Sequence, residues 1–207
     1  EGFTTSFDWK IKILKKLLVG VHLLHLNGYI HRDIKPENIL MESQDQPVIA
    51  DYGFIKAGTR AETLLGTFVY MAPELKLAQA YDNSVDVFAL GVTFFEILNS
   101  YNYRIKGNPY DSIVEHCEPK NQSKLIKGTF AEYEHSVYCK YFAKVITSMV
   151  VTIPKERSKV GEVIQWIANI EKEIELREKA FRDNLLEAMD KNNKNNEKLN
   201  QEVSNTP

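Results

Sequence analysis

The sequence lacks several features that mark common classes of protein. Its only cysteines, Cys117 and Cys139, have no CxxC or Cys/His spacing, which argues against a metal site or a disulfide framework. Lys and Arg number 26 against 28 Asp and Glu, so no basic field is available to hold nucleic acid. The longest apolar stretch, residues 85–98, contains Asp86 and Glu96 and is too short to cross about 30 Å of hydrocarbon. These absences predict reduced cysteines, no nucleic-acid partner, no membrane span, and an intracellular, cytoplasmic location.

The beginning of the chain also lacks familiar signals. Glu1 is not an initiator methionine, and no charged-then-apolar leader follows it, so we expect a start inside a longer protein. What is present suffices for one sizeable core, because 43% of the 207 residues are apolar and 11% are aromatic. We therefore expect one domain with an appendage.

Two long helices are predicted in the first hundred residues. Apolar residues recur at steps of three and four over residues 7–21, Ser6 is a suitable N-cap, and Gly28 marks the end. Over residues 84–98 the apolar side chains surround the helix axis instead of lining one stripe. The second helix is therefore expected at the centre of the domain.

A small β-hairpin is predicted between these helices. Two short apolar runs, residues 38–41 and 47–50, are separated by the polar residues 42–46. Shorter helices are expected over residues 110–117 and 136–150, after an irregular loop. The predicted fold class is mainly α with one small hairpin.

The last part of the chain is dense in charge. Helical spacing resumes after Pro154, and acids precede bases by four residues over 171–190, which predicts a solvated helical extension. Residues 191–207 are rich in Asn and nearly free of aliphatic side chains, which predicts a disordered tail. We expect the main domain to cover residues 1–170.

Residues 31–38 read HRDIKPEN, which resembles the H-R-D-x-x-x-x-N catalytic loop of protein kinases, a loop that combines the groups phosphoryl transfer needs. A carboxylate orients the attacking hydroxyl, a cation balances charge on the moving phosphoryl group, and an oxygen ligand binds Mg²⁺. Asp33, Lys35 and Asn38 fill these roles. With a helix before it and a strand after it, the octapeptide predicts a catalytic loop.

On these residues the chain resembles the eukaryotic-type serine/threonine protein kinases. The resemblance implies ATP and Mg²⁺ as cofactors and protein substrates as partners. Asp51 opens Asp51-Tyr52-Gly53, which resembles the family's D-F-G motif, whose Asp binds the Mg²⁺ that bridges the phosphates. Tyr52 replaces the family's Phe: its ring can pack against His31, but its hydroxyl needs a partner.

The resemblance continues through an activation segment. An A-P-E motif ending at Glu74 matches the end of this segment, and a G-T pair ending at Thr67 resembles the serine/threonine-type docking loop, although Phe68 replaces a common Pro. In the family, the docking Thr bonds the catalytic Asp and Lys. Arg32 offers a cation to a phosphate on this segment, and Thr63 is the best-placed hydroxyl to carry one.

Three further residues have roles implied by the resemblance. Asp86, in the first turn of the apolar helix, is expected to accept backbone N–H bonds, and in the family it braces residues 31–32. Arg157 resembles the family Arg that pairs with the Glu of A-P-E, here Glu74. Leu40 corresponds to the apolar floor under the adenine.

The family's Gly-rich loop and strand Lys would lie before the helix that opens at Phe7. Ten glycines are present and no two lie two positions apart, so G-x-G does not occur. We expect the C-terminal lobe of a kinase with its β-rich N-terminal lobe missing, and therefore a chain that is inactive alone.

Three functions stay open at this point. The first is that the chain is part of an active Ser/Thr kinase. The second is a pseudokinase or scaffold, which is favoured by Tyr52 and Phe68, the two residues that depart from the family pattern. The third is an interaction protein in which residues 163–189 pair with a partner helix; its apolar seam lapses near Arg177 and Glu178, which weakens the case for a coiled coil.

Overall fold

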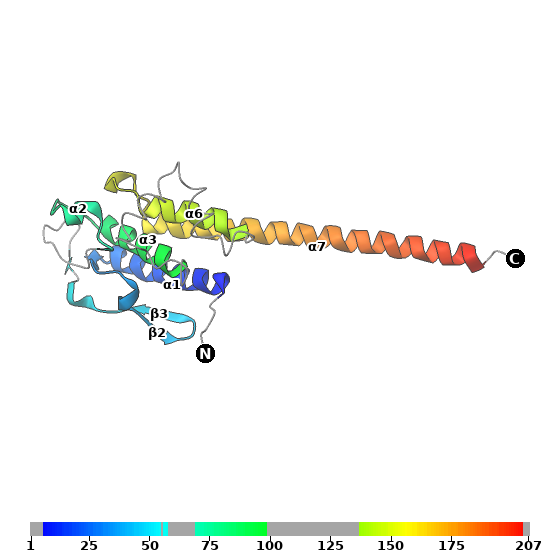
Figure 1. Cartoon of the computed structure of the whole chain (residues 1–207), viewed down its shortest axis with the longest axis horizontal. Coiled ribbons are helices and arrows are strands. Elements are labelled where there is room, and N and C mark those ends of the chain that lie inside the picture. The colour runs from blue at the N-terminus through cyan, green and yellow to red at the C-terminus, as the bar shows by residue number, and fades with distance from the viewer. Residues whose placement is uncertain (1–5, 55, 58–68, 99–136, 205–207) are drawn as a thin grey trace. The chain divides into compact units, whose positions relative to one another are not determined.

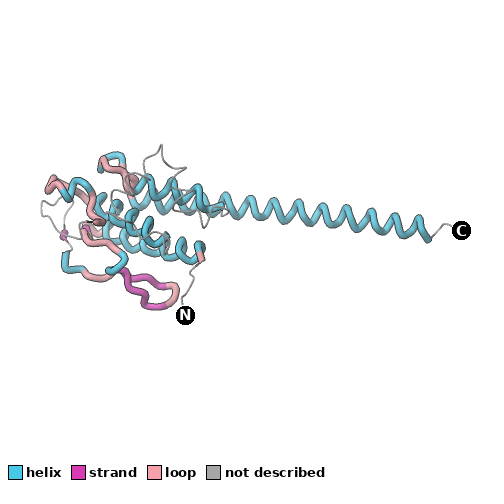
Figure 2. Tube along the Cα trace, in the orientation of Figure 1, coloured by secondary structure: helices cyan, strands magenta, loops and turns pink. Residues whose placement is uncertain are grey.

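The computed structural model describes residues 6–54, 56–57, 69–98 and 137–204. The chain divides into two compact units, residues 1–167 and 168–207. The first unit is mostly helical and carries two short strand pairs, which agrees with the mainly α fold expected from the sequence (Figures 1 and 2). No helix within the described residues combines the length and the apolar character needed to cross a membrane.

The first long helix, α1, spans Phe7–Leu26 and has the expected signals at both ends. The hydroxyl of Ser6 accepts the backbone N–H of Trp9 at 3.2 Å, which satisfies one of the helix's first free donors. After the C-cap Asn27, Gly28 adopts a φ of 75°, a left-handed conformation that glycine adopts at little cost. The predicted helix and its caps are confirmed.

The central helix, α3, spans Ser84–Leu98 and is buried along nearly its whole length. It packs against α1 and against α6, which spans Val137–Met149 (Figure 1). A Cβ on Gly91 would lie 2.8 Å from atoms of Met149 and Val150, so the glycine lets the end of α6 approach α3 closely. The predictions of a central helix and of a helix over 136–150 are both confirmed.

The predicted hairpin consists of β2 (Ile39–Ser43) and β3 (Gln46–Ile49), paired antiparallel. Its turn is shorter than the sequence indicated. Strand β3 packs against α1, and the indole N–H of Trp9 donates to the carbonyl oxygen of Gln44 at 3.0 Å. The Lys12 ammonium binds the Asp45 carboxylate, and this hydrogen bond holds the pKa of Asp45 below its usual value. The turn is thus fastened to α1.

A second strand pair was not predicted. Strand β1 (Tyr29–Ile30) pairs antiparallel with β4 (Lys56–Ala57). Each strand has only two residues, too few for an alternating pattern to be visible in the sequence. The pair brings the segment after Asp51 back to the start of the 31–38 loop.

The last helix, α7, runs from Val160 to Ser204 and corrects the expected tail. The extension expected over 171–190 lies within α7, but residues 191–204 are helical where disorder was expected. Asn costs at most about 0.7 kcal/mol per residue relative to Ala in a helix, and no Gly or Pro occurs between residues 162 and 206. The composition therefore weakens the helix without ending it. The compact units divide after residue 167, close to the expected boundary at 170.

Candidate functional site

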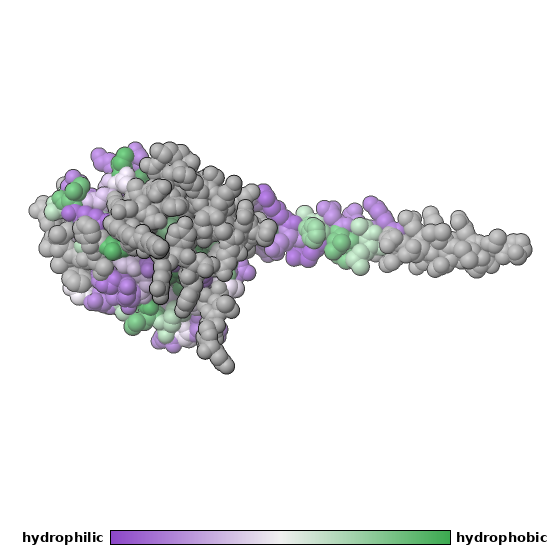
Figure 3. Space-filling model, in the orientation of Figure 1, coloured by the Kyte–Doolittle hydropathy of each residue, from purple (hydrophilic) through white to green (hydrophobic). Residues whose placement is uncertain are grey.

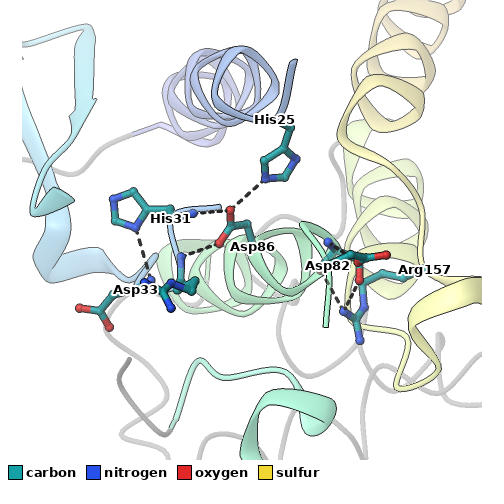
Figure 4. A network of polar contacts seen from close by, with 8 residues as sticks. His25, His31, Asp33, Asp82, Asp86 and Arg157 are labelled. Atoms are coloured by element: carbon teal, nitrogen blue, oxygen red, sulfur yellow. Dashed lines mark hydrogen bonds and ion pairs between the residues drawn. The ribbon is translucent and has the colours of Figure 1, made fainter. Parts of the chain in front are cut away.

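The carboxylate of Asp86, in the first turn of α3, holds the backbone where the 31–38 loop begins (Figure 4). Asp86 is fully buried, and its Oδ2 and Oδ1 accept the backbone N–H groups of His31 and Arg32, each at 2.8 Å. A buried carboxylate is costly unless such donors compensate it. The structure thus places Asp86 in contact with the two residues that the sequence associated with it.

His25, near the end of α1, is a third group on the same carboxylate. Its Nε2 lies 2.9 Å from Asp86 Oδ2, and its side chain is 8% exposed. His25 was not predicted to take part in the site. This contact joins positions 61 apart and depends on the packing of α1 against α3, so no local spacing in the sequence indicates it.

Asp33, Lys35 and Asn38 come together in the loop. Lys35 Nζ lies 2.8 Å from Asp33 Oδ2, and Asn38 Nδ2 donates to the same oxygen at 2.9 Å and to the Asp33 carbonyl oxygen at 2.8 Å. Asn38 is positioned by the single turn of helix Pro36–Asn38, in which Pro36 fixes the first φ angle. Asp33 is 4% exposed, so its carboxylate lies in a fixed position between an ammonium group and an amide.

Two residues of this region have left-handed backbone conformations. Arg32 has a φ of 73° and Asp51 a φ of 62°, which is uncommon for residues with a side chain. Such conformations cost roughly 1–3 kcal/mol each and persist only where the surroundings enforce them. For Arg32, Asp86 supplies that constraint by accepting a hydrogen bond from the Arg32 backbone N–H. The Arg32 guanidinium is buried, and its Nη1 lies 3.3 Å from the hydroxyl of Tyr81.

Asp51 follows β3 and is linked to the loop through its neighbour Ala50. The N–H of Ala50 donates to the Asn38 carbonyl oxygen at 2.8 Å, and His31 Nε2 lies 3.2 Å from the Ala50 carbonyl oxygen. The Asp51 side chain is exposed, and its Oδ1 accepts the N–H of Gly53 at 3.3 Å. The Tyr52 ring lies 5.7 Å from the His31 ring, the contact that the sequence analysis anticipated.

The donor set at this position fits a magnesium ion. Asn38 uses Nδ2 for both bonds to Asp33, so its Oδ1 is the atom that can face a cation, and the exposed Asp51 adds a carboxylate. Among the described residues, no group of three or more His, Cys, Asp or Glu side chains is arranged to bind a metal. Two protein ligands are what Mg²⁺ uses when phosphate oxygens and water complete its octahedron.

Glu74 and Arg157 form a buried ion pair. Glu74 lies in the short helix α2 (Pro73–Lys76), and its two oxygens lie 2.7 and 3.1 Å from Arg157 Nη1 and Nη2. Arg157 follows the helical turn Pro154–Glu156, stacks 5.0 Å from the Phe88 ring centroid, and donates to the Ser84 carbonyl oxygen. The pair ties the A-P-E motif to α3 and to the start of α7.

Beside the loop, the hairpin exposes apolar side chains. Leu40 is 56% exposed, and its cross-strand neighbour Val48 is also exposed. Tyr52 is 54% exposed, so the residue is not enclosed in an apolar site. Val19 and Leu23, on the adjoining part of α1, are exposed too, and with Val48 and Tyr52 they line a cavity of about 490 Å³.

The Tyr70–Glu96 contact is a further one that the sequence analysis did not single out. The Tyr70 hydroxyl donates to Glu96 Oε2 at 2.6 Å, which ties the chain just before the A-P-E motif to α3. Burial, and secondly the hydrogen bond to the Glu96 carboxylate, raise the pKa of the Tyr70 phenol above its ordinary value of 10.0. Thr63, Thr67 and Phe68, and the helix expected over 110–117, lie outside the described residues.

Comparison with known proteins supports the resemblance to protein kinases. The protein kinase domain family model matches residues 2–167. The "Probable serine/threonine-protein kinase MARK-B" of Dictyostelium discoideum is 28% identical over 156 residues, which cover 73% of this chain and 21% of that protein. The "Dual serine/threonine and tyrosine protein kinase" of Homo sapiens and that of Xenopus laevis are each 39% identical over 93 residues, 44% of this chain and 10% of those proteins. The chain thus spans about a fifth or less of the length of these relatives.

Proposed function

Because the chain belongs to the protein kinase family, we propose that residues 1–170 form the C-terminal lobe of a kinase domain. In a protein that also supplies the N-terminal lobe, this lobe transfers the γ-phosphoryl group of ATP to Ser or Thr of protein substrates. The observation that carries the proposal is the contact of Asp33 with Lys35 and Asn38. A fixed, buried carboxylate between a cation and a metal-binding amide is what phosphoryl transfer requires.

Each residue of the cluster has a distinct proposed role. Asp33 orients the substrate hydroxyl and accepts its proton, and Lys35, held on Asp33, places its ammonium beside the transferred phosphoryl group. Asn38 and Asp51 hold Mg²⁺, which when bound neutralises charge on the phosphates. Leu40 lies under the adenine.

Two features support the lobe assignment. Leu40, Val48 and Tyr52 are exposed beside the cluster, which is unfavourable unless another surface covers them. The sequence also contains no G-x-G motif to close over phosphates. Residues 1–207 alone should therefore bind ATP very weakly and transfer no phosphate, because the nucleotide would have only its lower face covered.

Ser/Thr specificity and regulation involve the part of the chain outside the described residues. Lys35 and the docking residue Thr67 favour a Ser/Thr hydroxyl, while some relatives are named as dual-specificity kinases. Thr63 is the proposed phosphorylation site, and Arg32 is the cation that would receive its phosphate. Replacing Thr63 by Ala in active protein, with mass spectrometry of the segment, tests the switch: full activity without phosphate on this segment would reject it.

The second candidate is a pseudokinase or scaffold. The observation that favours it is Tyr52, which is 54% exposed at a position where the family has an apolar Phe. This candidate predicts that no phosphoryl group is transferred, whether or not Mg²⁺-ATP binds.

One comparison separates these readings. Residues 1–207 and a two-lobed protein, in which the N-terminal lobe of the Dictyostelium relative precedes Phe7, are titrated with Mg²⁺-ATP by calorimetry and assayed with labelled ATP on a generic protein substrate. We expect transfer to Ser and Thr by the two-lobed protein only. Micromolar binding or transfer by residues 1–207 would reject the lobe assignment, and binding without transfer by the two-lobed protein would favour the pseudokinase. Phosphotyrosine in the product would reject strict Ser/Thr specificity.

A further inference from the structure

Two features of the described chain have no part in the proposed function. One is the set of exposed apolar side chains on α7, with Phe181 at 69% exposure (Figure 3), and nothing in the structure shows what covers them. The other is Asn27-Gly28 at the end of α1, the only Asn in the sequence that is followed by Gly. Asn is chemically labile, and Gly has no side chain to shield its backbone nitrogen. The two residues can therefore react with each other.

The reaction open to this pair is deamidation through a cyclic imide. The backbone nitrogen of Gly28 loses its proton and bonds to Cγ of Asn27, the Cγ–Nδ2 bond breaks, and Nδ2 leaves as ammonia. Water from the solvent then opens the ring at either of its carbonyl carbons, which leaves aspartate or isoaspartate at position 27. Overall, water is consumed and ammonia is released, and no oxidant or reductant is needed.

In the folded chain, the last turn of α1 holds both reacting groups. Asn27 Nδ2 donates to the Leu23 carbonyl oxygen at 2.7 Å, and the Gly28 N–H donates to the His25 carbonyl oxygen at 3.1 Å. The nitrogen that must lose its proton is thus protected by a hydrogen bond. Asn27 is exposed, and a Cβ on Gly28 would have no atom within 4 Å, so solvent reaches the pair once the turn opens.

We propose that Asn27 is a deamidation site controlled by the last turn of α1: the closed turn protects it, and opening of the turn allows the reaction. The product no longer supports the closed turn. A carboxylate cannot donate to the Leu23 carbonyl oxygen, and its negative charge lies beside the carbonyl groups that end the helix. Isoaspartate also adds a methylene group to the backbone just before β1.

The altered position is close to the loop that Asp86 holds. Tyr29–Ile30 is followed directly by His31, whose N–H donates to Asp86, and His25, in the turn that opens, contacts the same carboxylate. Deamidation therefore loosens the backbone before Asp33. Its effect on phosphoryl transfer rests on the proposed function.

Peptide mapping of residues 1–207 after incubation in mildly alkaline heavy-oxygen water tests the reaction, because opening of the imide incorporates the heavy oxygen. In urea that unfolds the chain, Asn27 should deamidate before any other asparagine. Gly28→Ala should slow this reaction, because the new side chain hinders the attacking nitrogen. Under native conditions, Asn27 should react more slowly by about tenfold or more.

Two matched variants test control by the turn. His25→Leu removes the contact with Asp86 and should speed the native reaction, whereas His22→Leu on the same helix should not. Equal rates in urea and in native buffer, or another asparagine that reacts first in urea, would overturn the proposal.

Asn27→Asp tests the consequence without the use of kinase activity. Amide hydrogen exchange over residues 29–33 should be faster in this variant than in the parent chain. Asn184→Asp makes the same chemical change at an exposed position of α7 and should leave this exchange unchanged. Equal exchange in all three chains would reject the link to the loop, whereas absence of phosphoryl transfer would count against the proposed function alone.

Discussion

His25 and Asp86 are in direct contact: the imidazole Nε2 lies 2.9 Å from Asp86 Oδ2, although 61 positions separate the two residues. The same oxygen accepts the N–H of His31, and Oδ1 accepts that of Arg32. One buried carboxylate therefore connects the end of α1, the start of α3 and the backbone just before Asp33. The position of the Asp86 carboxylate therefore depends on His25, a side chain with no direct role in the proposed chemistry.

We expect His25→Leu to lower kcat of the two-lobed protein several-fold while the KM for ATP changes less. The leucine leaves Asp86 with one donor fewer, which costs roughly 1–3 kcal/mol and loosens the backbone that positions Asp33. His25→Gln can still donate to the carboxylate and should recover part of the loss. His22→Leu, a change on the same helix with no contact to Asp86, is the control. Equal losses in the two leucine variants would indicate a general effect on α1.

The Glu74–Arg157 pair should dominate the stability of the first unit. Removing one partner of a buried ion pair leaves an uncompensated charge and typically costs about 3–5 kcal/mol. Arg157→Met should therefore lower the midpoint of thermal unfolding strongly. Arg177→Met breaks the exposed pair with Glu173 and should cost less than about 1 kcal/mol. Similar shifts in both variants would mean that the buried pair is not the special contact that its geometry indicates.

How much of this structure the sequence predicts depends on how far apart the interacting residues lie along the chain. Helix α1 follows from Ser6, Gly28 and the apolar spacing between them, all of which are local. The clustering of Asp33, Lys35 and Asn38 was also predictable, because a fixed five-residue spacing and one helical turn suffice to bring them together. These features need no knowledge of the rest of the chain.

Contacts made by tertiary packing were less accessible. The Glu74–Arg157 pair was expected only through resemblance, and the contacts His25–Asp86 and Tyr70–Glu96 were missed because nothing near either residue indicates its partner. The end of α7 was misjudged for another reason. The prediction of disorder relied on the low average helix propensity of Asn. A helix, however, usually ends at a helix-breaking residue such as Gly or Pro, and neither occurs before Ser204 within the last turns of α7.

Tyr70 should make the unfolding free energy depend on pH in alkaline solution. Its pKa is raised in the folded protein, above the value of 10.0 expected in the unfolded chain. Above pH 10 the unfolded state therefore loses this proton before the folded state does, and the stability provided by the neutral phenol is lost as pH rises. Urea unfolding between pH 9 and 11 should show a steeper loss for the parent chain than for Tyr70→Phe. Parallel curves would show that the phenol is not held in its neutral form.

The two acidic groups of the proposed active site should fail in different ways when each is made neutral in the two-lobed protein. Asp33→Asn keeps the side-chain shape but removes the carboxylate that orients the hydroxyl, so kcat should fall by at least about a hundredfold while Mg²⁺-ATP binding is largely kept. Asp51→Asn removes a charged metal ligand, so Mg²⁺-dependent ATP affinity should fall as well. Asp45→Asn makes the same chemical change on the hairpin turn, outside the proposed site, and should leave both quantities near those of the parent. Nucleotide affinity measured by calorimetry, together with single-turnover transfer, separates the two effects. Near-normal turnover in Asp33→Asn would reject its role, and unchanged Mg²⁺-ATP affinity in Asp51→Asn would reject the metal assignment.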